Sequence, residues 1–154
     1  MLGSVDFRII DIGLFVIANL INLLLIGIFL SRPKGLKKAE HILGLFVVAM
    51  ILPVGVAIVL NILEKREWRT IFLPMILILF LKIELLFDYI LKLNFRKTRL
   101  LWPYLLLYYL AMMAMIGYSF SIGNTYGFVT LSTYFLGLFA TWYSYSTVGH
   151  GKEH

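Results

Sequence analysis

Charged side chains interrupt the apolar run at residues 71–91, where Lys82, Glu84 and Asp88 stand among apolar neighbours and Lys92 follows directly. If this run crosses a membrane as a helix, each charge costs about 2.5–3.5 kcal/mol on insertion scales, and such residues mark candidate functional sites. At about 100° per residue, Glu84, Asp88 and Lys92 form one stripe, whereas Lys82 projects roughly 160° away from Glu84. Because neighbouring carboxylates can share one proton, Glu84 with Asp88 forms a candidate proton or cation site.

The same four residues also fit a structural role. Asp88 and Lys92 have the i, i+4 spacing of an ion pair, and Glu84 would then be protonated and hydrogen-bonded. Lys82 has no acid on its own face of the helix, so three outcomes are open. It bonds to polar groups inside the bundle, it loses its proton through burial, or it pairs with an acid of another chain.

Further polar residues lie in the other apolar runs. Asn19 and Asn22 stand three apart on one face of the first run, and amides within membranes commonly hydrogen-bond between helices. Tyr108 and Tyr134 belong to the last two runs, together with threonines and small residues at helical spacings. Close helix packing explains both groups. The sharper alternative is a semi-polar cavity that takes a lipid, a quinone or an aromatic ligand.

Signatures of catalysis and of metal binding are absent from the sequence. The chain has no cysteine, which excludes disulfides, iron–sulfur clusters and Cys-ligated zinc. It also lacks a Gly-rich phosphate loop, an HExxH motif and a GxSxG motif. No catalytic or metal-binding residue is therefore assigned, the cofactor is unknown, and enzymatic function has no support.

Composition places these polar residues in a membrane. Of the 154 residues, 61% are hydrophobic and 14% are charged, whereas soluble domains have roughly 45–50% and about 25%. Five apolar runs occur, at residues 9–30, 42–63, 71–91, 100–120 and 126–146. Each is close to the roughly 20 residues that a helix needs to cross about 30 Å of hydrocarbon. The sequence predicts an all-α transmembrane bundle with five membrane-spanning helices, the second bent at Pro53.

The connections between the runs are short, which predicts antiparallel neighbours in a single transmembrane domain over residues 1–148, with a short polar tail at 149–154. The connection at residues 121–125 carries no charge, but Gly123 and Asn124 form a turn signal. Asp6 and Asp11 are unlike the basic start of a signal peptide, so the first run is expected to remain as a helix.

Lysine and arginine are distributed unevenly about the runs. Nine of the fourteen lie in segments on the side of the C-terminus, four lie on the opposite side, and Lys82 lies within a run. The positive-inside rule therefore predicts an N-out, C-in orientation. Because these segments account for the net charge of +6, no nucleic-acid partner is expected. The predicted location is multi-pass, in the plasma membrane of a prokaryote.

Three functions remain open, and the lipid bilayer is the partner common to all. The first is a non-enzymatic subunit or scaffold of a membrane complex, associating with itself or with another membrane protein through Lys82. The second is a small proton- or cation-coupled carrier or channel component that uses Glu84 and Asp88. The third is a lipid- or quinone-binding membrane protein that uses Tyr108 and the tyrosines near it.

Overall fold

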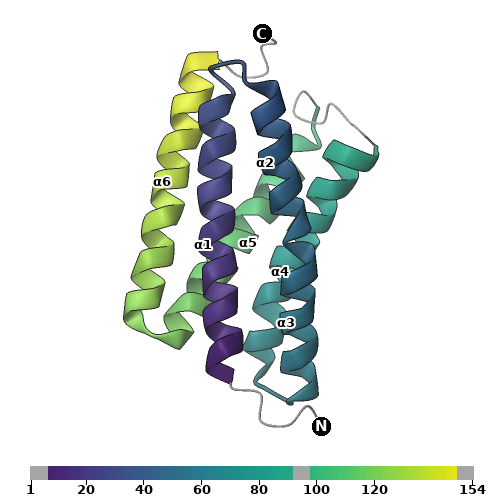
Figure 1. The fold of residues 1–154 in the computed structure, drawn as a ribbon, viewed down its shortest axis with the longest axis vertical. Helices are drawn as coiled ribbons and strands as arrows, with labels where there is room; N and C mark the ends of the chain where they lie inside the picture. Colours follow the sequence, from purple (N-terminus) through teal and green to yellow (C-terminus); the bar gives the residue numbers. More distant parts are fainter. Residues whose placement is uncertain (1–6, 92–97, 149–154) are drawn as a thin grey trace.

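A computed structural model describes residues 7–91 and 98–148 of the chain. In chain order, its elements are α1 (Phe7–Ser31), α2 (Lys37–Ala49), α3 (Ile51–Leu63), α4 (Trp68–Glu84), the π-helical η1 (Leu85–Ile90), α5 (Leu101–Ile122) and α6 (Asn124–Val148). The prediction of an all-α bundle is confirmed (Figure 1). Lys92 and the predicted tail at 149–154 lie outside the described residues.

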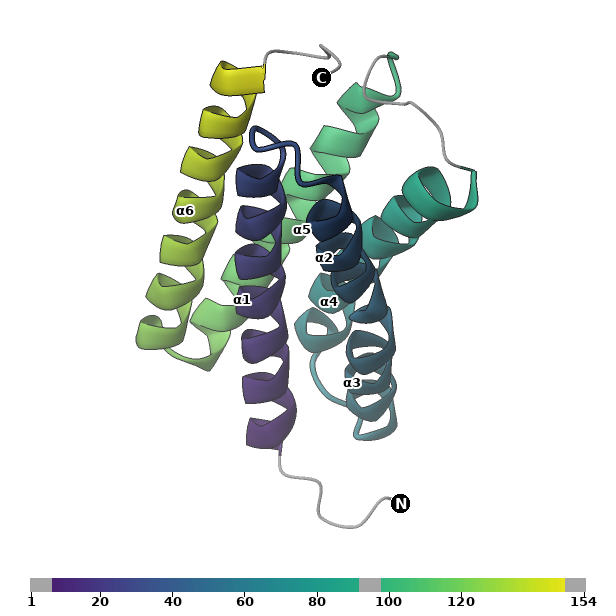
Figure 2. The ribbon, with the colours of Figure 1, turned by 45° about the horizontal axis from the view of Figure 1, so that its top comes forward.

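With α2 and α3 taken as one segment, and α4 and η1 as another, successive segments run in opposite directions along the bundle (Figure 1). α1 packs against α6 on one side and against α2 and α3 on the other, while α4 packs against α5 (Figure 1). We call the end where α1, η1 and α6 finish the Arg32 end, and the end where α1 begins the Asp11 end. At the Arg32 end, α4 and η1 lean away from α1 and α6 (Figure 2).

Four helical segments of the described chain are long and apolar enough to cross a membrane: Arg8–Ser31, Lys37–Leu63, Trp68–Ile90 and Leu101–Ile122. These segments indicate a multi-pass membrane protein that contacts the bilayer. Large apolar side chains stay exposed along them, Leu52 at 75% and Leu106 at 63%, as expected of a lipid-facing surface.

The fifth predicted span corresponds to α6, which does not reach the apolarity of the other four. It is as long as α1, at 25 residues, but serine, threonine and tyrosine replace aliphatic residues along it. That α6 crosses the membrane, and that the N-terminus lies outside, therefore stay predictions.

The second span is divided at Met50, where α2 ends and α3 begins. Pro53 explains the position of this break. Its ring clashes with the carbonyl of the residue four before it, Ala49, and proline has no N–H to donate to that carbonyl. The span regains helical bonding at once, since the Val54 N–H donates to the Met50 carbonyl at 3.1 Å.

The third span widens into a π-helix at η1, immediately after Glu84. Its wider turn is closed by the Leu91 N–H, which donates to the carbonyl of Leu86, five residues earlier, at 2.8 Å. Single π-turns within α-helices occur frequently at functional sites. This one carries Asp88 and Tyr89 and changes the directions that regular α-helical spacing gives them.

Candidate functional site

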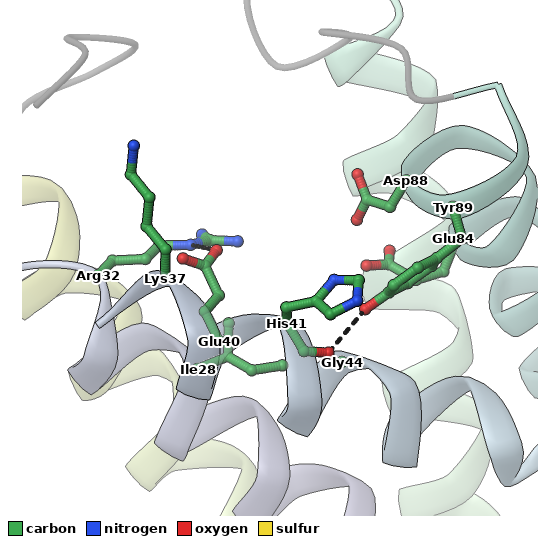
Figure 3. A pocket seen from close by; sticks show the side chains of 9 residues that line it. All are labelled: Ile28, Arg32, Lys37, Glu40, His41, Gly44, Glu84, Asp88 and Tyr89. Carbon is green, nitrogen blue, oxygen red and sulfur yellow. Dashed lines mark hydrogen bonds and ion pairs between the residues drawn. The ribbon is translucent and has the colours of Figure 1, made fainter. Parts of the chain in front are cut away.

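Glu84 lies at the Arg32 end, at the junction of α4 and η1, and lines two adjoining cavities. The first, which we call the polar cavity, has a volume of about 200 Å³. It is lined by Ile28, Arg32, Lys37, Glu40, His41, Gly44, Glu84, Asp88 and Tyr89 (Figure 3). The basic side chains come from the end of α1 and the start of α2, whereas Glu84 and Asp88 face them from α4 and η1.

The second cavity, which we call the apolar cavity, has a volume of about 370 Å³. It is lined by Leu25, Ile28, Phe29, Arg32, Glu84, Leu101, Trp102, Tyr104, Leu105, Tyr108, Tyr109 and Thr141. Its volume falls within the range of about 300–1,000 Å³ that is usual for small-molecule sites. Trp102 is 72% exposed, so the edge of this cavity reaches the outer surface of the bundle, where lipid is expected.

Arg32 and Glu84 stand at the boundary between the two cavities, because both of them line both cavities. Arg32 donates through Nε to the Glu40 Oε1 at 2.8 Å, and its guanidinium carbon lies 5.2 Å from the centre of the Phe29 ring. Glu84 accepts a hydrogen bond at Oε2 from the Tyr104 hydroxyl. Together with Ile28, which also lines both cavities, these two polar residues lie between a polar compartment and an apolar one, which is an arrangement suited to an amphiphile.

Tyr89 closes the side of the polar cavity between η1 and α2. Its hydroxyl donates to the His41 carbonyl at 3.3 Å, and its ring centre lies 5.3 Å from that of His41. The absence of a side chain at Gly44 makes this possible, because a Cβ there would overlap the Tyr89 hydroxyl. The width of the cavity therefore depends on a glycine in α2.

The structure separates the charged residues that the sequence singles out. Glu84 and Asp88 line the polar cavity, whereas Lys82 is exposed on the outside of α4. Among the described residues Lys82 has no hydrogen-bond or ion-pair partner, so it is not bonded inside the bundle. The predicted pair of Asp88 with Lys92 cannot be placed, because Lys92 lies outside the described residues.

The two asparagines of α1 face α6. Asn19 donates to the Thr130 hydroxyl at 3.0 Å and accepts from the Thr133 hydroxyl at 2.8 Å. Asn22 donates to Thr133 at 2.9 Å, and Thr130 donates to Ser119 of α5 at 2.8 Å. These bonds join three helices through groups that lipid could not satisfy.

Of the two tyrosines proposed for a ligand cavity, the structure brings one to the candidate site. Tyr108 lines the apolar cavity, with its ring centre 5.4 Å from that of Phe80. Tyr134 is 6% exposed and lies 5.9 Å, centre to centre, from the ring of Phe135. It lines neither of the two cavities.

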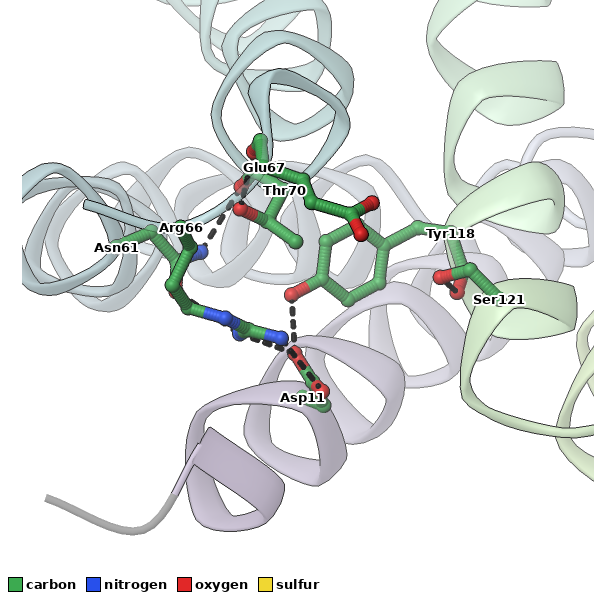
Figure 4. Close-up of polar contacts among 7 residues, drawn as sticks. All are labelled: Asp11, Asn61, Arg66, Glu67, Thr70, Tyr118 and Ser121. Atoms are coloured by element: carbon green, nitrogen blue, oxygen red, sulfur yellow. Dashed lines mark hydrogen bonds and ion pairs between the residues drawn. The ribbon is translucent and has the colours of Figure 1, made fainter. Parts of the chain in front are cut away.

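A second polar cluster occupies the Asp11 end (Figure 4). Arg66, in the turn between α3 and α4, binds both carboxylate oxygens of Asp11, at 2.7 and 3.1 Å. Asp11 also accepts from the Tyr118 hydroxyl at 2.5 Å, and Arg66 donates to the Asn61 Oδ1 at 3.0 Å. The hydrogen bond to Asp11 raises the pKa of the Arg66 guanidinium above its ordinary value, so this side chain stays charged.

Sequence reasoning missed this cluster because Asp11 and Arg66 are 55 residues apart. In the sequence, Asp11 bears on whether the first run is a signal peptide, and Arg66 counts only toward the predicted orientation. A signal was nevertheless available: with antiparallel spans, the start of the first and the end of the second lie at the same end. An acid and a base at that end are expected to meet.

Comparisons with models of protein families, with curated proteins and with solved structures found no match for this chain. Within residues 7–91 and 98–148, no three His, Cys, Asp or Glu side chains gather in a way that could hold a metal ion. The candidate site is thus defined by its two cavities and by the charges between them.

Proposed function

We propose that this chain is a membrane protein that binds one amphiphilic molecule, a lipid or a quinone, at the Arg32 end of its bundle. The observation that carries this proposal is the boundary formed by Arg32 and Glu84 between the polar and the apolar cavity. An amphiphile has one polar and one apolar part, which fit these two cavities. Its polar group would lie beside Arg32 and Glu84, and its apolar part among Phe29, Leu105 and Tyr108.

The carrier hypothesis uses the same acids but has less support. Between the Arg32 end and the Asp11 end, a void lined by Ala18, Ile21, Asn22, Leu77, Met112, Met115 and Thr130 has essentially no room for a water molecule. A proton or cation held at Glu84 therefore has no hydrated path through this part of the bundle in the conformation described. Coupled transport would require a second conformation in which this void opens.

We expect that Leu105→Trp abolishes most amphiphile binding, because an indole in the apolar cavity occupies the space of the apolar part of the ligand. Native mass spectrometry of protein released from a gentle detergent would measure the retained small molecule. The matched control is Leu106→Trp, on the same helix but 63% exposed and outside the cavity lining. Equal retention by the two variants, or a wild type without bound amphiphile, would contradict the proposal.

The exposed Lys82 supports a second candidate function, a subunit of a membrane complex. It lies in a row of exposed apolar residues along α4 and η1 that includes Phe72, Met75, Leu79 and Leu86. Lipid satisfies the apolar members of this row but not an ammonium group at membrane depth. Among the described acids only Glu67 is exposed, and it lies at the Asp11 end, so residues 7–91 and 98–148 of a second copy offer no exposed acid at the depth of Lys82. We infer that the partner is a different membrane protein with a carboxylate at that depth.

Lys82→Met should dissociate such a complex, since it removes the charge and keeps a similar length of apolar side chain. The measurement is the subunit stoichiometry of the protein extracted from its own membrane in a mild detergent. Leu79→Met, one turn earlier on the same exposed row, is the control and should leave the stoichiometry unchanged. Identical complexes in wild type and Lys82→Met would exclude Lys82 as a docking residue.

A further inference from the structure

The polar cavity has walls of opposite charge. Arg32, in the turn after α1, and Lys37, at the start of α2, line one side together with Glu40, which is paired with Arg32. The Lys37 ammonium points away from the opposite side, which Glu84 and Asp88 line from α4 and η1 (Figure 3). A ligand group carrying a single charge would be attracted by one wall and repelled by the other. A group that carries a positive and a negative charge at its two ends matches both walls.

Arg32 is equipped to bind an anion as well as Glu40. Its Nε–H is used by Glu40, but the four Nη–H groups have no hydrogen-bond partner among the described residues. Guanidinium groups bind phosphate oxygens through two parallel N–H donors. Lys37 is exposed at the start of α2, and its ammonium lies at the rim of this side (Figure 3), so that with Arg32 paired to Glu40 the side keeps one net positive charge.

The opposite wall presents two carboxylates one helical turn apart, on Glu84 and Asp88. The Tyr104 hydroxyl holds the Oε2 atom of Glu84, which fixes the orientation of this carboxylate at the boundary of the cavities. A primary ammonium has three N–H donors and can bond to several carboxylate oxygens at once. A trimethylated ammonium has none, and a glycerol headgroup carries no positive charge.

We propose that the site selects a lipid whose headgroup joins a phosphate to a primary ammonium, as in phosphatidylethanolamine. The phosphate binds Arg32 and Lys37, the ammonium binds Glu84 and Asp88, and an acyl chain enters the apolar cavity. This inference rests on the proposed function, because it assigns the headgroup chemistry of the amphiphile bound there.

The test is a competition between lipids that differ only in their headgroups. Delipidated protein in detergent receives an equimolar mixture of phosphatidylethanolamine, phosphatidylcholine and phosphatidylglycerol with identical acyl chains, and native mass spectrometry counts each bound lipid. We expect at least a tenfold preference for phosphatidylethanolamine over each of the other two. In Glu84→Gln this preference falls to about onefold, because the amide keeps the size of the side chain but loses the charge.

The matched control is Glu67→Gln, the same substitution at an exposed acid of the Asp11 end that lines neither cavity, which should keep the full preference. Arg32→Gln should instead lower the retention of all three phospholipids together. Equal binding of phosphatidylethanolamine and phosphatidylglycerol by the wild type, or a preference that survives in Glu84→Gln, would overturn the headgroup assignment and leave amphiphile binding intact. If no lipid is retained at all, the proposed function itself fails.

Discussion

Arg66→Met is expected to lower the free energy of unfolding by about 3–5 kcal/mol, the usual cost of removing one partner from a buried ion pair. The side chains of Arg66 and Asp11 are only 14% and 18% exposed, and the guanidinium binds both carboxylate oxygens. Without it, Asp11 keeps the Tyr118 hydroxyl but loses its countercharge. Reversible unfolding in mixed micelles of a mild detergent and SDS would measure the difference.

The exposed pair of Arg69 with Glu67 provides the control for this prediction. Its N···O distance is 2.8 Å, close to that of the buried pair, but its side chains are 55% and 69% exposed. Arg69→Met should therefore cost less than about 1 kcal/mol. The double variant Asp11→Leu with Arg66→Met should regain most of the stability, because no charge is left without its partner. Equal effects of Arg66→Met and Arg69→Met would show that the Asp11 cluster does not stabilise the bundle.

Phe80→Ala is expected to destabilise the bundle by about 2–3 kcal/mol. Phe80 is 1% exposed, and its ring centre lies 5.7 Å from that of Tyr104 and 5.4 Å from that of Tyr108. In a membrane, little free energy is gained by moving apolar groups away from lipid, so mainly the cost of the empty space remains. A residual cavity on the order of 100 Å³, at about 24 cal/mol per Å³, accounts for the estimate.

The same variant should also weaken amphiphile binding, because Tyr104 and Tyr108 line the apolar cavity and would lose the ring that packs against them. Leu79→Ala is the control. Leu79 directly precedes Phe80, but it is 51% exposed to the bilayer side of α4, so lipid fills the space that it leaves. Unfolding in the same mixed micelles distinguishes the two residues, and similar losses for both would show that Phe80 is not a packing residue of the core.

Part of the fold follows from the sequence because it depends on local properties. The length and apolarity of the first four runs predict spans that the structure contains as Arg8–Ser31, Lys37–Leu63, Trp68–Ile90 and Leu101–Ile122. The break at Met50 follows from the covalent structure of Pro53. The exposure of Lys82 and the inward position of Glu84 accord with the angle that two residues span on an α-helix.

The candidate site, in contrast, was predicted only as single residues. Glu84, Asp88 and Tyr108 stood out because polar groups are costly within apolar runs. The sequence did not predict that Arg32, whose charge bears there only on the orientation, would lie close to them. Arg32 joins them because α1 ends beside the junction of α4 and η1, so that one guanidinium borders both cavities. The residue pattern within one apolar run does not show which residues of another run it will contact.

The sequence by itself therefore determined that the chain is helical and which segments are long and apolar enough to span a membrane. These properties arise from the hydropathy and helical geometry of each segment taken alone. Tertiary structure decided that Asp11 meets Arg66 across 55 residues, that η1 widens into a π-helix beside Glu84, and that several helices enclose a polar and an apolar cavity. The physical reason is that side chains distant in the chain become neighbours only through helix packing, which depends on the shapes of all the helices at once.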